Sequence, residues 1–321
     1  MTMYMLVYHI YFGIRRALKK RKSRFLQRVL DYIEAYYNLR VKEKYEKSNC
    51  LKSGVTSEKR GQKIIVSLTS YPARIETVWL TIETLLRQTV KPDAVILWLA
   101  DEQFPDKEAL PEKLKLQVTR GLQIRFCEKD LKSHKKYFYV MQEYPEDIVI
   151  LADDDIFYPY DMIDKLMKMH AEYPSDICAC TTQVIYPSIE ADPIMWRNPR
   201  VDEPIIHSSQ VQVFTGSGSL YPPHSLLENA FDCDEIMQCC PYADDMWLTF
   251  KALANGTKIT SFRKWRSFPV MIYETSKNSL WNINYSEGQN DTQWNNLKEY
   301  FQDEFDLIRC NYNEEIGNVV Q

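Results

Sequence analysis

Several signatures that would assign this chain to a common class are missing. Residues 62–156 contain neither the Gly-x-Gly-x-x-Gly of dinucleotide-binding folds nor the Gly-x-x-x-x-Gly-Lys-Ser/Thr of P-loops, which disfavours both. The eight cysteines include no Cys-x-x-Cys pair, which argues against a zinc site. Because their placement is irregular and no cleavable signal peptide is visible, we expect reduced thiols in a cytoplasmic protein.

A long hydrophobic run is also missing. The apolar stretch at residues 3–14 has twelve residues, whereas a helix needs about 20 to cross a bilayer. Residues 1–28 hold eight Lys/Arg and no acid. We therefore predict that residues 1–28 attach peripherally to an anionic membrane surface, on the cytoplasmic face of the inner membrane. The alternative is a helix packed on its own domain or on a subunit.

The rest of the chain is acidic. Outside residues 1–28, 32 basic residues face 44 acidic ones, so this part carries a charge near −12. A nucleic-acid binder would present a basic face on the folded domain, and we expect no nucleic acid as a partner. Helical spacing continues over 29–45 and a polar linker follows at 46–61. We predict a helical extension with linker at 1–61 and a single domain at 62–321.

Apolar runs alternate with helical patterns in the first half of that domain. Strands are predicted at residues 63–68, 94–100, 122–127 and 148–151, with helices at 75–89 and 135–143 between them. Strands that alternate with helices predict an α/β fold with a mostly parallel sheet.

Three consecutive acids follow the last of these strands. Asp153, Asp154 and Asp155 are placed where a buried strand leaves the sheet, which is where open α/β sheets bind ligands. If the strand alternation continued, Asp153 and Asp155 would point the same way and Asp154 the other. Two converging carboxylates with phosphate oxygens suit Mg²⁺ or Mn²⁺. The alternative is a solvated acidic turn at a helix start.

The order of these motifs resembles bacterial glycosyltransferases of the GT-A (nucleotide-diphospho-sugar transferase) fold, over about residues 62–300. The matching segments are Ser67-Leu68-Thr69-Ser70-Tyr71-Pro72-Ala73-Arg74-Ile75, Leu86-Arg87-Gln88 with Lys91-Pro92-Asp93, the Asp-Asp-Asp strand, Thr215-Gly216-Ser217-Gly218-Ser219-Leu220-Tyr221-Pro222-Pro223 and Ala243-Asp244-Asp245-Met246-Trp247-Leu248. The resemblance implies a mostly parallel mixed sheet flanked by helices, with donor binding in 62–156 and acceptor binding in 157–321. It also implies transfer from a nucleotide-sugar, with UDP-sugar expected, to a glycan or lipid-linked acceptor in surface polysaccharide synthesis.

The resemblance also implies roles for particular residues. Asp153 and Asp155 match the Asp-x-Asp motif that holds the metal and the donor diphosphate, with Asp154 at the donor beside them. Other donor-binding candidates are Tyr71, Arg74, Asp101 and Lys136. Arg74 and Asp101 are equally compatible with exposed loop charges, and the lysine cluster at 132–136 with a solvated helix start. No histidine follows His224, so phosphate and water are expected to complete the metal shell.

Asp244 and Asp245 open a predicted helix that runs from Met246 to Ala254. Capping needs one acid, so we expect Asp244 to cap the helix. The resemblance implies that an acid at this place faces the acceptor hydroxyl and, in inverting members, acts as the catalytic base, a role that we expect for Asp245. The two roles are reversed if the boundary shifts by one residue.

Two other classes of function stay open. A metal-dependent nucleotidyl- or phosphotransferase also needs clustered acids, and a membrane-associated binding protein needs no catalysis.

Overall fold

The computed structural model describes residues 23–48, 52–200, 203, 205–261, 270–272, 284 and 288–319. The apolar run at 3–14 and most of the basic cluster after it lie outside this part of the chain. No helix in the described part combines the length and hydropathy that crossing a membrane requires.

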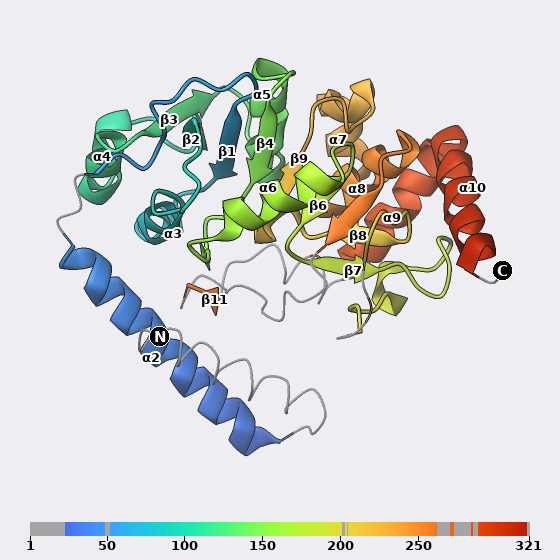
Figure 1. Ribbon diagram of the computed structural model, residues 1–321, viewed down its shortest axis with the longest axis horizontal. Helices are drawn as coiled ribbons and strands as arrows, with labels where there is room; N and C mark the ends of the chain where they lie inside the picture. Colours follow the sequence, from blue (N-terminus) through green and yellow to red (C-terminus); the bar gives the residue numbers. More distant parts are fainter. Residues whose placement is uncertain are drawn as a thin grey trace.

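The centre of the protein is a seven-stranded sheet in the order β10-β6-β9-β4-β1-β2-β3 (Figure 1). Strand β9 runs antiparallel to β4 and β6, and the other neighbouring pairs are parallel. The prediction of an α/β fold with a mostly parallel mixed sheet flanked by helices is confirmed. The strands of this sheet are β1 (Ile64–Thr69), β2 (Ala94–Ala100), β3 (Leu122–Cys127), β4 (Ile148–Leu151), β6 (Ile177–Ala179), β9 (Ser219–Tyr221) and β10 (Ile259–Ser261).

Two short antiparallel pairs lie outside the main sheet. Strand β5 (Ile156–Phe157) pairs with β11 (Val270–Met271), and β7 (Thr182–Val184) pairs with β8 (Val211–Val213). The first pair begins directly after the three acids, so it fixes the chain on the far side of the acidic turn.

The central strands are apolar on both faces because both faces are covered. Along β2, Ile96 and Trp98 face one core while Val95 and Leu97 face the other. The first core packs against helices α5 (Lys135–Glu143), α7 (Cys233–Cys239), α8 (Asp244–Ala254), α9 (Gln289–Tyr300) and α10 (Gln302–Val319). The second packs against α2 (Arg24–Glu46), α3 (Val78–Leu85), α4 (Glu112–Val118) and α6 (Met162–Glu172). The predicted ranges 94–100, 122–127 and 135–143 coincide with β2, β3 and α5.

A buried ion pair anchors α8, the helix that carries Asp244 and Asp245. Lys251 is fully buried, and its Nζ lies 2.8 Å from Glu304 Oε2 on α10. The same ammonium lies 3.4 Å from the centre of the Phe301 ring, a cation–π geometry. This lysine therefore holds the acid-bearing helix against the C-terminal helices.

We expect Lys251→Ala to lower the free energy of unfolding by about 3–5 kcal/mol, because it removes one partner of a buried pair and opens space among aromatic rings. Urea denaturation followed by circular dichroism measures this change. Lys298→Ala is the control and should cost little, since its ammonium donates to the carbonyl of the exposed Glu190 at 3.1 Å and forms no ion pair with any described residue. Equal stability of both variants would contradict the anchoring role.

Candidate active site

The three acids lie in a turn, not on a continuing strand. Strand β4 ends at Leu151, and Arg74 Nη1 contacts both Asp154 Oδ1 at 2.5 Å and Asp155 Oδ2 at 2.9 Å. The expectation that Asp153 and Asp155 share one face and Asp154 the other is therefore wrong, because the chain turns at Asp154 and Asp155 and the strand alternation ends there. Asp153 points elsewhere and its side chain remains 41% exposed.

Lys136 joins the two acidic motifs. Its Nζ lies 2.7 Å from Asp153 Oδ1 and 2.8 Å from Asp244 Oδ2, and only 2% of its side chain is exposed. These acids are 91 positions apart in the sequence, and α5 brings the ammonium between them from the face of the first core. The ammonium thus contacts two carboxylates and positions them relative to each other, while a contact of Lys136 with the donor diphosphate stays a prediction.

The start of α8 differs from the expected cap. The residue at the N-cap is Ala243, with no side-chain hydrogen bond, and Asp244 is the first helical residue. The expectation that Asp244 caps the helix is wrong, because its carboxylate binds Lys136 and accepts from Thr215 Oγ1 at 2.7 Å. Asp245 Oδ1 accepts from the Thr215 backbone N–H at 2.7 Å and also from its hydroxyl. Within the described residues both bonds to Asp245 end on Oδ1, which leaves Oδ2 for another donor.

The cluster holds more negative than positive charge. Burial and then Asp154 and Asp153 raise the pKa of Asp155 to about 7, while Arg74 acts in the opposite direction. Burial and then Asp244 raise the pKa of Asp245 to about 7. Burial raises the pKa of Asp244, but Lys136 and the smaller contributions of its other neighbours together outweigh burial and bring this pKa to about 2.

The nearby His134 adds no positive charge near neutral pH. Burial lowers its pKa to about 4, and its ring nitrogens contact the Tyr137 hydroxyl at 3.1 Å and the Cys240 carbonyl at 2.8 Å. The five acids at positions 153, 154, 155, 244 and 245 are therefore balanced by Arg74 and Lys136 alone among the described residues.

The donor set fits a divalent cation in charge and in atom type. Carboxylate oxygens are the ligands that Mg²⁺ and Mn²⁺ prefer, and the excess of acids gives a cation a favourable place. In the described part of the chain no three His, Cys, Asp or Glu side chains form a ready-made metal cage. Asp153 is the more accessible carboxylate and Asp155 already contacts Arg74, so a cation held here would need phosphate and water as further ligands.

The remaining predicted donor-binding residues, Tyr71 and Asp101, differ in their position relative to the acidic cluster. Tyr71 lies beside the cluster, with the Arg74 guanidinium 5.5 Å from its ring centre, and burial raises its pKa. Asp101 follows β2 and pairs with Lys107 at 2.7 Å, with both side chains about half exposed. The structure thus brings Tyr71 and Arg74 to the acids, while Asp101 lies in a solvated ion pair.

Three positioning side chains were not among the predicted site residues. Ser70 Oγ donates to Asp154 Oδ2 at 2.5 Å, and the Tyr158 hydroxyl accepts from the Asp153 N–H at 2.7 Å while donating to the Gly216 carbonyl. Thr215 is the third. All three stand within or next to the motifs quoted above, but only their contacts reveal these roles.

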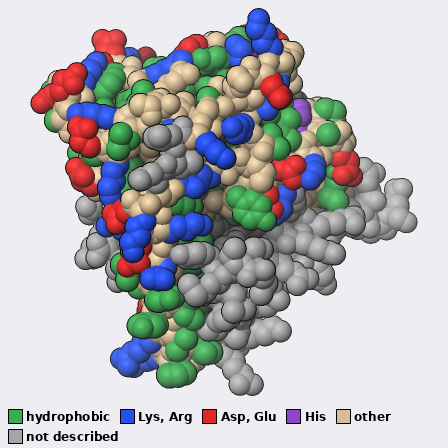
Figure 2. Space-filling model, turned by 60° about the vertical axis from the view of Figure 1, so that its left-hand side comes forward, with side chains coloured by type: hydrophobic (Ala, Val, Ile, Leu, Met, Phe, Trp, Pro, Cys, Tyr) green, Lys and Arg blue, Asp and Glu red, His purple; other side chains and the backbone are tan. Residues whose placement is uncertain are grey.

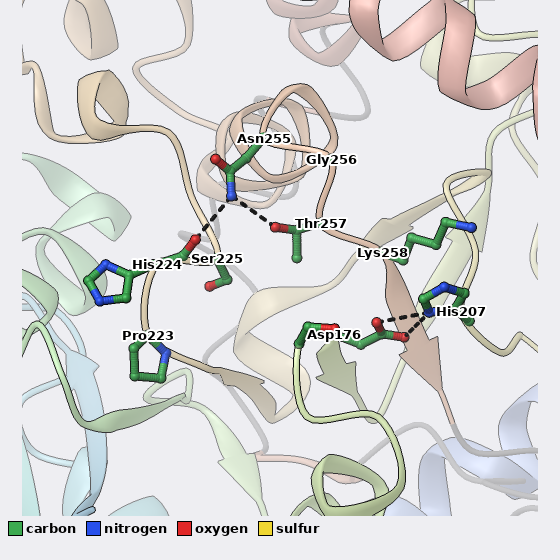
Figure 3. Close-up of a pocket in the computed structure, with 10 residues that line it drawn as sticks. Asp176, His207, Pro223, His224, Ser225, Asn255, Gly256, Thr257 and Lys258 are labelled. Atoms are coloured by element: carbon green, nitrogen blue, oxygen red, sulfur yellow. Dashed lines mark hydrogen bonds and ion pairs between the residues drawn. The ribbon is translucent and has the colours of Figure 1, made fainter.

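A separate cavity of about 370 Å³ lies at the opposite edge of the sheet (Figure 3). Asp176 and Lys258 line it and immediately precede β6 and β10, whereas the acids follow the end of β4. Buried Asp176 accepts from Thr260 Oγ1 at 2.7 Å and contacts His207 Nδ1 at 3.0 Å. This cavity is therefore distinct from the acidic cluster.

We expect Gly216→Ala to disturb the acidic cluster, because an added Cβ would lie only 1.8–2.1 Å from the carboxylate atoms of Asp153. If this cluster is catalytic, displacement of Asp153 should reduce turnover on the order of 10²-fold. Turnover of the purified variant measures the effect. Gly61→Ala is the matched control, since its Cβ would meet nothing within 4 Å. Normal turnover of Gly216→Ala would exclude Asp153 from the reaction.

No family model matches this chain, and no curated protein sequence matches it. The solved structure of mannosyltransferase PcManGT from Pyrobaculum calidifontis in complex with GDP-Man and Mn²⁺ is similar at a TM-score of 0.48 and 12% identity, covering 96% of this chain and 79% of that one. S. aureus TarS 1-349 is similar at a TM-score of 0.40 and 12% identity, covering 63% and 58%. At this identity and with both TM-scores below 0.5, neither likeness bears on the reaction of this chain.

Proposed function

We propose that the chain is a metal-assisted glycosyltransferase that moves a sugar from a nucleotide-sugar to a glycan or lipid-linked acceptor, in the manner of surface polysaccharide synthesis. The observation that carries the proposal is the contact of Lys136 with both Asp153 and Asp244, at 2.7 and 2.8 Å. Through it the two motifs that resemble the donor and acceptor motifs of GT-A glycosyltransferases form one network. A transferase needs its donor and acceptor groups within reach of each other.

On the donor side we assign the diphosphate to Asp153 and Asp155 with Mn²⁺ or Mg²⁺. When bound, such an ion neutralises the charge that develops on the departing nucleoside diphosphate. Arg74 keeps Asp154 and Asp155 in place, and Ser70 fixes Asp154 from the other side. We assign Tyr71, whose ring lies 5.5 Å from the Arg74 guanidinium, to the border of the nucleotide site, with uridine diphosphate as the proposed carrier.

On the acceptor side we assign Asp245 as the general base. Thr215 holds its Oδ1, so Oδ2 is the atom proposed to take the proton of the attacking hydroxyl. Asp244 is not equivalent, because Lys136 keeps it ionised with a low pKa. A base with a pKa of about 7 is well matched to proton transfer near neutral pH.

Asp155→Asn should abolish the dependence on Mn²⁺, because it removes a charged ligand while keeping the size of the side chain. In a thermal-shift assay, Mn²⁺ with the donor at about 100 times its Kd should stabilise the wild type by roughly 2.7 kcal/mol and the variant by much less. Asp161→Asn is the control, since that acid pairs with Lys165 at 2.9 Å outside the cluster. An equal metal-dependent shift in both variants would remove Asp155 from the metal site.

Asp245→Asn should reduce transfer by ~10²–10⁴-fold, the range typical of a lost general base, while donor binding is kept. Because the base must be ionised, wild-type kcat/KM should rise with pH up to about 7 and then level off. This rise should be absent from the residual activity of the variant. Rates measured between pH 5 and pH 9 test the expectation.

Asp244→Asn is the informative comparison. It removes a charge that Lys136 contacts at 2.8 Å, so stability should fall by about 1.5–3 kcal/mol. Asp245→Asn should not lower stability, because it relieves repulsion in a cluster rich in acids. Full transfer by both variants, or retention at the anomeric carbon of the product, would refute the general-base role.

A metal-dependent nucleotidyl- or phosphotransferase is distinguished by which group moves. A donor labelled separately in the sugar and in the β-phosphate gives sugar label alone in the product of a glycosyltransferase. Phosphate label in the product identifies the other class, and no transfer with any sugar nucleotide would leave a binding protein. A panel of sugar nucleotides with Mn²⁺, screened by thermal shift, identifies the donor.

We also keep the proposal that residues 1–28 attach the protein peripherally to an anionic membrane. Its support is the basic composition of that segment, whose first 22 residues lie outside the described part.

A further inference from the structure

Helix α2 packs on the domain through one face only. Leu30 and Val41 are 4% and 5% exposed, and Ile33, Tyr37 and Tyr45 pack partly buried against the same core. These positions follow the spacing of a single helical face, so α2 is part of the folded body and holds a fixed orientation. Figure 1 shows the helix at the margin of the molecule, beside the β11 pair and away from α10.

The opposite face of α2 is also apolar. Phe25 and Tyr32 are each 74% exposed, Leu39 is 55% exposed and Tyr36 is 39% exposed. At 100° per residue these four positions fall within about 60° of one another, so they form one stripe that points away from the domain. Large apolar side chains gathered on one exposed face mark an interaction surface. We call these four residues the outer stripe.

Basic side chains flank the outer stripe at the N-terminal end of α2. Arg24 and Arg28 are exposed, and within the described residues neither forms an ion pair. Of the acids on the helix, Glu43 pairs with Arg40 at 3.0 Å, Glu46 pairs with Lys113 at 2.7 Å, and Asp31 accepts a hydrogen bond from Gln27 Nε2 at 2.8 Å. Figure 2 shows basic and apolar side chains together at the projecting tip of the molecule.

This charge pattern selects one occupant. A second copy of α2 paired in parallel would set Arg24 and Arg28 against themselves, and an antiparallel copy would offer them Glu43 and Glu46, which already pair with Arg40 and Lys113. An anionic lipid surface complements these charges and accepts Phe and Tyr at its interface. We propose that the outer stripe of α2 lies in the surface of an anionic membrane, with Arg24 and Arg28 at the lipid headgroups.

Docking through α2 would orient the acidic cluster. Asn38 donates to the Met271 carbonyl at 3.1 Å, Met271 pairs with Ile156, and the Ile272 N–H donates to the Asp155 carbonyl at 2.7 Å. The inner face of the helix thus reaches the acidic turn through β11, so a membrane that binds the outer face of α2 holds this turn in a fixed orientation. If the proposed transferase activity holds, its acceptor is therefore membrane-borne and lipid-linked.

The test uses the full-length protein and vesicles of phosphatidylcholine with or without phosphatidylglycerol. Phe25→Ser/Tyr32→Ser should reduce co-sedimentation with phosphatidylglycerol vesicles on the order of tenfold or more. The matched control is Tyr300→Ser/Leu307→Ser, whose side chains are 49% and 56% exposed on α9 and α10. The control should bind as the wild type does. Both variants should keep the wild-type melting temperature, because all four side chains are exposed.

Undiminished vesicle binding by Phe25→Ser/Tyr32→Ser overturns the proposal. Light scattering that shows a wild-type dimer and a monomeric variant with intact vesicle binding reassigns the stripe to self-association. The acceptor is tested with membranes and a sugar-labelled nucleotide-sugar, and label is expected in the lipid-soluble fraction. Label only in water-soluble glycan overturns the acceptor assignment. Vesicle binding without any transfer is a failure of the proposed function alone.

Discussion

The candidate site depends on one buried cation. Lys136 is nearly inaccessible and contacts Asp153 and Asp244, which come from different elements and from distant parts of the sequence. A buried ammonium is stable only when nearby carboxylates offset the hydration that it has lost. The ammonium in turn stabilises the negative charge of both acids. The position of α5 relative to the acidic turn and α8 is therefore fixed by electrostatics as well as by packing. Disturbing any of the three affects both acidic motifs.

The surrounding fold makes that arrangement rigid. The sheet carries an apolar core on each face, and the acidic turn leaves it between β4 and the β5–β11 pair. Thr215 links both acids of α8 to the loop before β9, and Tyr158 links the same loop to the Asp153 backbone. The loop at Thr215 thus couples the two motifs a second time. Its Gly216 leaves room for the Asp153 carboxylate, which a side chain at this position would fill.

The acids and the outer stripe of α2 are connected through one short strand pair. Asn38 reaches β11, β11 pairs with β5, and β5 follows the acidic turn. The polar cavity beside Asp176 and His207 lies at the other edge of the sheet. The two ends of the strands therefore differ in character. One end carries five acids that only Arg74 and Lys136 balance among the described residues, and the other carries a buried acid that already contacts Thr260 and His207.

The sequence alone determined the α/β class, the ranges of β2, β3 and α5, and the places of both acidic motifs, because these follow from local apolar periodicity. The directions of the acids were decided by the tertiary structure. The alternation of side chains along β4 did not extend past Leu151. The Asp244 carboxylate pairs with Lys136 and does not cap α8. No local sequence pattern indicates that a lysine on α5 lies between two acids that are 91 positions apart. Such contacts arise only when the sheet order and both cores bring these elements together, since electrostatic partners are set by distance in space and not along the chain.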